Sequence, residues 1–171
     1  MAVDAATIAD LTTVRRRDPQ AVAQAWRAVE LTPGDPQVLW MAAFAIWNMA
    51  DEIEPARELF ERSLAINPNS AMALVLGGWV EAMRGNQKAG RAMIERAQRL
   101  NPRDPRGWFA SAALAICAML DGDFTEAVMW ADKALAQNRR FAVALRVLIV
   151  ALVKTGETAR ATQIARELLK V

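Results

Sequence analysis

A turn that recurs at nearly constant spacing is the feature that most constrains how this chain folds. Pro33, Pro68 and Pro102 recur about every 34 residues, and Asn67 and Asn101 stand directly before the last two. Asn138-Arg139 occupies the corresponding place after a slightly longer interval, with Arg instead of Pro. Because Pro cannot continue a helix, each Pro marks the end of a helical segment. A period of this size predicts repeated units, and these must stack because one unit cannot bury its own apolar face.

Small residues recur at fixed distances before each of these turn marks. They stand twelve and five residues before the mark, a spacing that places them on one face of a helix. Small side chains there allow neighbouring helices to approach closely. Three glycines recur at a similar interval and mark a second turn inside the unit, where a positive φ favours Gly. The small residues are Ala21, Ala56, Gly90 and Ala127 at twelve and Ala28, Ser63, Ala97 and Ala134 at five, and the glycines are Gly85, Gly122 and Gly156.

The composition favours helices throughout. The chain of 171 residues is 54% hydrophobic, which suffices for one packed domain, and its apolar content is largely Ala with Leu and Met rather than alternating β-branched residues. Segment 1–17 carries Ile8, Leu11 and Val14 on one helical face before a break at Asp18-Pro19. The sequence therefore predicts an all-α protein that begins with a helix.

These features resemble the tetratricopeptide repeat family, whose 34-residue helix-turn-helix unit has a large residue early in its first helix and Pro at its end. Trp40, Leu74, Trp108 and Leu145 occupy the large position. The resemblance implies a right-handed α-α superhelix of about four helix pairs plus an N-terminal helix, forming a single solenoid. Its approximate units are 1–36 (partial), 37–70, 71–104, 105–141 and 142–171, with three extra residues of the fourth range placed around 118–121.

A narrower resemblance concerns 100–138 and 141–161, which are similar to repeats that follow the catalytic domain of bacterial adenylate/guanylate cyclases and to repeats of some winged-helix regulators. It implies that the chain is a C-terminal regulatory or dimerisation region of a larger bacterial signalling protein. No part of the sequence matches a cyclase catalytic domain, so it implies no nucleotide chemistry.

The residues offer little for catalysis. The chain has no His, which removes the commonest general base and metal ligand. Asp121-Gly122-Asp123 with Glu126 lacks the further ligands of a calcium loop, and Gly85–Arg91 lacks the Lys-Ser/Thr of a phosphate-binding loop. We therefore expect no enzyme activity and no cofactor or metal.

Charge and cysteine content give expectations about the partners and the cellular compartment of the protein. A net charge of +2 does not indicate nucleic-acid binding, and no apolar run is long enough for a membrane span. The N-terminus does not resemble a signal peptide, and the single Cys117 favours a reducing compartment. We expect a cytoplasmic location.

The resemblance implies that the first helix of each unit lines a concave groove. We expect this groove to bind a segment of a protein partner or of another domain of the same polypeptide. The groove positions follow from the resemblance, and they are mostly apolar, rich in Met and basic at one end. The alternative is that these side chains form core. The open apolar face at Ile164 and Leu168 would also favour a homodimer. The expected groove residues are Met41, Ala45, Asn48, Met49, Met72, Val75, Trp79, Met83, Arg106, Phe109, Ile116, Arg146 and Val150.

Overall fold

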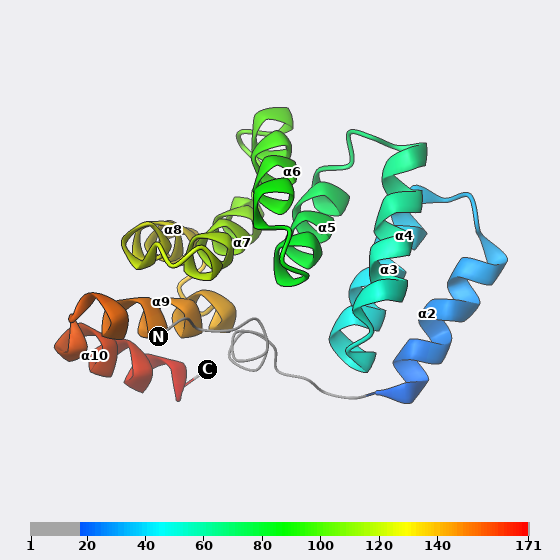
Figure 1. Ribbon diagram of the computed structural model, residues 1–171. Coiled ribbons are helices and arrows are strands. Elements are labelled where there is room, and N and C mark those ends of the chain that lie inside the picture. The colour runs from blue at the N-terminus through cyan, green and yellow to red at the C-terminus, as the bar shows by residue number, and fades with distance from the viewer. Residues whose placement is uncertain (1–17, 171) are drawn as a thin grey trace.

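The computed structural model describes residues 18–170, and across that range the chain folds into helices joined by short turns (Figure 1). The helix expected in 1–17 lies outside the described residues. The helices are α2 (Pro19–Leu31), α3 (Pro36–Ala50), α4 (Ile53–Ile66), α5 (Ala71–Met83), α6 (Gln87–Leu100), α7 (Gly107–Leu120), α8 (Phe124–Gln137), α9 (Ala142–Thr155) and α10 (Thr158–Leu168).

Helices α3 to α10 form four pairs of a first and a second helix, α3–α4, α5–α6, α7–α8 and α9–α10, and α2 packs on α3. Figure 1 shows successive pairs rotated against one another along the array. The expected all-α superhelix is confirmed.

Capping residues and left-handed turns fix the helix boundaries. The carboxylates of Asp35 and Asp123 accept hydrogen bonds from backbone N–H groups in the first turns of α3 and α8. Gly85, Gly122 and Gly156 adopt positive φ between the helices of a pair, and Asp51, with a φ of 64°, takes this place in the α3–α4 pair. The sequence prediction for the three glycines is confirmed.

First and second helices are buried to different extents. Most residues of α5 and α7 are buried, whereas α4, α6 and α8 bury only one stripe. The small positions lie on that stripe: Ala56 and Ala127 have no exposed surface, and Gly90 is buried where α5 crosses α6. A Cβ on Gly78 would lie 2.6 Å from the Gly90 carbonyl oxygen, so the two backbones touch.

The predicted place of the extra residues around 118–121 is wrong. Both α5 and α7 end two residues before a positive-φ glycine, so their C-terminal ends correspond. The connection that is longer is 101–106, compared with 67–70 and 138–141 elsewhere. Within it the Asp104 N–H donates to the Asn101 carbonyl and the Gly107 N–H to the Asp104 carbonyl, so two turns follow each other.

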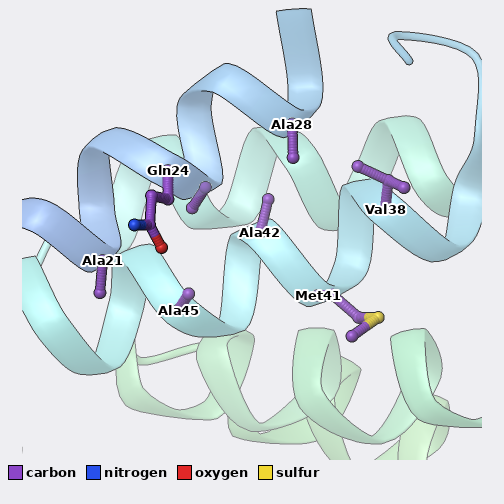
Figure 2. Close-up of a pocket in the computed structure, with 8 residues that line it drawn as sticks. Ala21, Gln24, Ala28, Val38, Met41, Ala42 and Ala45 are labelled. Carbon is purple, nitrogen blue, oxygen red and sulfur yellow. The ribbon is translucent and has the colours of Figure 1, made fainter. Parts of the chain in front are cut away.

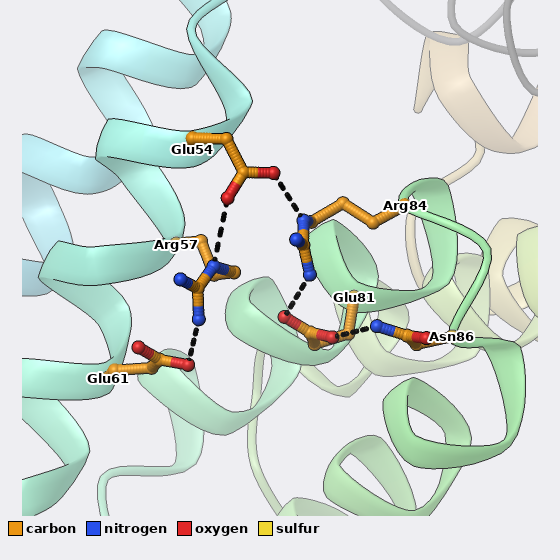
Figure 3. A network of polar contacts seen from close by, with 6 residues as sticks. All are labelled: Glu54, Arg57, Glu61, Glu81, Arg84 and Asn86. Atoms are coloured by element: carbon orange, nitrogen blue, oxygen red, sulfur yellow. Dashed lines mark hydrogen bonds and ion pairs between the residues drawn. The ribbon is translucent and has the colours of Figure 1, made fainter.

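Arginines tie each pair to its neighbour. Arg84 at the end of α5 bonds Glu54 of α4 at 2.6 Å within a network that includes Arg57, Glu61 and Glu81 (Figure 3). Similar bonds join α6 to α8 and α8 to α10: Arg91 is bidentate to Glu126 at 2.7 Å, and Arg160 bonds both carboxylate oxygens of Asp132. Such charge-assisted bonds set the orientation of one pair against the next.

Candidate partner-binding surface

On α3 the expected groove residues retain exposure. Met41 is 51% exposed, and Ala45, Asn48 and Met49 are partly buried. The side-chain amide of Asn48 donates to the Phe44 carbonyl at 2.8 Å, so it bonds within its own helix.

On α5 three of the four expected residues are buried. Val75, Trp79 and Met83 are at most 7% exposed, and the Trp79 ring packs edge-on against Trp47 of α3 with centroids 5.2 Å apart. These side chains form core between the first helices, as the alternative interpretation held. Only Met72 is partly exposed.

On α7 Ile116 is fully buried, whereas Phe109 is partly exposed and Arg106, just before the helix, is exposed. Phe109 stacks on Trp108 at 4.2 Å and contacts Phe141 at 5.4 Å. When α5 and α7 are aligned by the positive-φ glycines that follow them, Ile116 corresponds to Trp79. The repeat offsets had instead predicted that Ile116 corresponds to a groove position further along α5. The longer connection before α7 causes this shift.

On α9 Val150 and Arg146 are partly exposed. The Arg146 Nη1 atom is buried and makes no hydrogen bond within the described residues. A buried guanidinium nitrogen without an acceptor costs free energy, which an acceptor from outside would recover. We call Met72, Arg106, Phe109, Arg146 and Val150 the inner face.

Two of the hollows within residues 18–170 lie against expected groove residues. A small one of about 30 Å³ lies between α5, α6 and α7, beside Met72, Arg106 and Phe109. The other, of about 300 Å³, lies between α2 and α3 and is almost wholly apolar (Figure 2). Its lining residues are Ala21, Gln24, Ala25, Ala28, Val38, Met41, Ala42 and Ala45.

The charged side chains around α8 cap the helix and bond its neighbours. Asp123 caps α8, and Glu126 bonds both Arg91 and the Trp130 indole N–H, at 3.0 Å for the latter. The Arg91 guanidinium lowers the pKa of the Glu126 carboxyl. Burial raises the pKa of the Cys117 thiol to about 12, so it stays protonated at neutral pH. Among residues 18–170 no three His, Cys, Asp or Glu side chains gather as metal ligands.

Solved structures with similar chain paths identify the fold. PilW, described as a widely conserved type IV pilus biogenesis factor, is 22% identical, with 89% of this chain and 70% of that chain covered and a TM-score of 0.75. A tetratricopeptide repeat protein from Parabacteroides merdae is 16% identical over 97% of this chain and 64% of that one, with a TM-score of 0.70. The chain therefore has a tetratricopeptide-repeat fold. PilF of Pseudomonas aeruginosa has it too, at 18% identity over 88% of this chain and 67% of that chain, with a TM-score of 0.69.

No protein-family model matches the sequence, and a comparison with curated proteins finds no match. None of the three similar structures is a cyclase or a winged-helix regulator, so the narrower resemblance has no support. Within 18–170 no helix has the length and apolarity that crossing a bilayer requires.

Sequence reasoning missed the aromatic cluster of Phe44, Trp108, Phe109 and Phe141 and the arginine ties between pairs. The rings of Phe44 and Phe109 lie 6.4 Å apart although the two residues belong to different, non-adjacent units, and no local pattern marks them as neighbours. The sequence carried a weak indication of the arginine ties, since the bonded arginines and carboxylates lie 28 to 35 residues apart, close to the length of one repeat.

Proposed function

We propose that this tetratricopeptide-repeat array is a non-catalytic module that binds a segment of a protein partner along the inner face. The observation that carries the proposal is the row of partly exposed apolar side chains on successive first helices, Met72, Phe109 and Val150. Apolar side chains that remain accessible along a rigid surface fit the apolar face of a helix or an extended segment.

Charge adds a chemical preference for the partner. Arg106 is exposed beside Phe109, and Arg146 holds a buried nitrogen without an acceptor among the described residues. A carboxylate on the bound segment would supply that acceptor. The partner we propose is an apolar segment with an acidic group, on another protein or on another domain of the same polypeptide, in a reducing compartment such as the cytoplasm.

The test compares charge placed on the inner face with charge placed elsewhere. The variant carries Met72→Glu and Val150→Glu, and its control carries Met129→Glu, because Met129 is 54% exposed on the second helix α8. Proteins captured by the immobilised chain and identified by mass spectrometry should bind the control as they bind the original chain. The double variant should capture them at least tenfold less, with unchanged helical circular dichroism. Equal capture by both variants would show that the inner face is not the binding surface.

Homodimer formation stays a prediction. Leu169, just after α10, is 88% exposed, and an exposed large apolar side chain favours self-association. Light scattering over a dilution series tests this prediction: a constant monomer mass would contradict it.

A further inference from the structure

Positive charge gathers on two neighbouring connections of the array. The connection between α6 and α7 lies beside the one between α8 and α9, since the rings of Trp108 and Phe141 are 4.5 Å apart. A Cβ on Gly107 would also lie 3.2 Å from the side-chain oxygen of Gln137, the last residue of α8. The two connections and the last turn of α6 hold five exposed arginines. We call these the arginine surface: Arg99, Arg103, Arg106, Arg139 and Arg140.

Little negative charge balances these arginines. Segments 99–106 and 137–141 contain one carboxylate, that of Asp104, so together they carry a net charge of +4 and the rest of the chain is net negative. The Asp104 carboxylate already accepts the backbone N–H of Arg106 at 2.8 Å. Like charges gathered on one surface repel one another, and a bound anion would relieve that repulsion. Three of the arginines form no ion pair with the residues that the structure describes: Arg99, Arg103 and Arg139.

The arginines stand where the chain departs from its repeat. The connection 101–106 is longer than the connection 67–70, and it contains Arg103 and Arg106. Arg139 stands where the earlier turns have Pro. The earlier turns end their helices without an arginine at these places, so helix termination does not account for the arginines.

Two exposed leucines flank the arginine surface. Leu100, the last residue of α6, is 44% exposed, and Leu169, just after α10, is 88% exposed. The C-terminal end of α10 lies beside this surface because the Arg140 guanidinium donates to the Lys170 carbonyl oxygen at 3.2 Å. The hollow beside Arg106 holds about 30 Å³, room for only one or two water molecules, so it cannot take a side chain of a protein partner. Leucines that protrude among arginines suit a surface that yields around them.

We propose that the arginine surface docks the protein on the anionic face of a lipid bilayer, with Leu100 and Leu169 entering the headgroup region. A guanidinium group bonds two phosphate oxygens at once, and each arginine near an anionic leaflet adds to the attraction. Exposed leucine side chains leave water when they enter the boundary between headgroups and acyl chains. A nucleic acid fits less well, because the rings of Trp108 and Phe141 pack on each other instead of offering free faces to bases. Of the inner face only Arg106 belongs to this surface, so the proposal does not depend on the proposed protein partner.

Co-sedimentation with lipid vesicles tests the docking. Phosphatidylcholine vesicles that contain about a third phosphatidylserine should bind the chain, and pure phosphatidylcholine vesicles should not. The variant with Arg103→Glu and Arg139→Glu should bind the anionic vesicles about tenfold more weakly, with unchanged helical circular dichroism. Its control carries Arg27→Glu and Lys88→Glu, two exposed cations outside the arginine surface, so the net charge changes equally and binding should stay close to that of the original chain. No binding of the original chain to anionic vesicles, or an equal loss in both variants, would overturn the proposal.

A fluorescent label tests whether the leucines enter the bilayer. In a Cys117→Ala background, an environment-sensitive label on Leu100→Cys should shift its emission to the blue when anionic vesicles are added. The control is the same label on Leu31→Cys, because Leu31 ends α2 as Leu100 ends α6 and is 65% exposed, but lies outside the arginine surface. No shift at Leu100→Cys, or equal shifts at both positions, would overturn the proposal. Binding of polyglutamate in preference to the vesicles would also overturn it and would indicate an acidic protein partner.

Discussion

The contact of Gly78 with Gly90 gives a sharp prediction about stability, because Gly77, the neighbour of Gly78 in α5, serves as its control. Gly→Ala inside a helix gains about 1 kcal/mol from helix propensity, and this gain applies equally at both positions. At Gly78 the new Cβ would lie 2.6 Å from the Gly90 carbonyl oxygen, which is backbone. At Gly77 the nearest atoms, at 3.3 Å, are Cβ of Phe60 and the flexible end of Met93.

The magnitude follows from these distances. A carbon approaches a carbonyl oxygen to about 3.3 Å, so Gly78→Ala would separate α5 from α6 by about 0.7 Å. A gap of that size forfeits a quarter to a half of the dispersion energy at the contact, and overpacking costs about 1–3 kcal/mol. Because the obstructing atom is backbone and cannot turn aside, the upper end of this cost, about 3 kcal/mol, applies at Gly78. Subtracting the propensity gain of about 1 kcal/mol, we expect Gly78→Ala to lower the free energy of unfolding by about 2 kcal/mol, which lowers Tm by about 4–8 °C. Gly77→Ala should be neutral or stabilising by up to about 1 kcal/mol.

Thermal and urea unfolding, followed by circular dichroism at the helix band, measures both variants against the original chain. The decisive quantity is the difference between the two variants, because propensity cancels in it. A Gly78→Ala protein as stable as Gly77→Ala would refute the close backbone contact between α5 and α6.

Three further predictions concern single side chains. Since Arg91 lowers the pKa of Glu126, their bond stabilises the fold above the unfolded carboxyl pKa of about 4.3, and this stabilisation is lost as pH falls through the lowered pKa of the folded state. Glu126→Gln should therefore lower the free energy of unfolding by about 1 kcal/mol at pH 7 and leave it unchanged in strong acid, which urea unfolding across pH measures. Gly122→Ala should lower the unfolding free energy by about 1 kcal/mol because its φ is +81°, whereas Gly34→Ala, in equally open space without a positive φ, should not; equal effects would contradict this. Cys117, whose pKa burial raises to about 12, should react with a thiol reagent at pH 8 at least a hundredfold more slowly than in denaturant.

The periodic features of the fold could be predicted from the sequence. Asn-Pro turns, small residues and glycines act within one or two helices, so their spacing alone placed Gly85, Gly122 and Gly156 at the turns and Ala56, Gly90 and Ala127 on the buried stripe. The extra residues of 101–106 could not be placed in this way, because a longer connection and a longer helix give the same total spacing.

The exposure of the groove residues was harder to predict. Whether Trp79 and Met83 face a partner or the core depends on how far one first helix slides over the next, and the contact of Trp79 with Trp47 decides this. Hydrophobicity does not distinguish the two cases, since core and binding surface use the same residue types. At Arg106 the charge was more informative, because burying a guanidinium is costly, and this side chain is exposed.

The arginine ties have a consequence for how the molecule forms. The side-chain bonds from Arg84 to Glu54, Arg91 to Glu126 and Arg160 to Asp132 span 28 to 35 residues, so these contacts between neighbouring pairs close loops of about one repeat. A chain with such low contact order can begin folding at any adjacent pairs and grow in both directions, with little entropy lost at each step. During synthesis, each pair could dock on its predecessor as soon as it leaves the ribosome. Under an applied force the same locality would let the pairs detach one after another, in a series of small extensions.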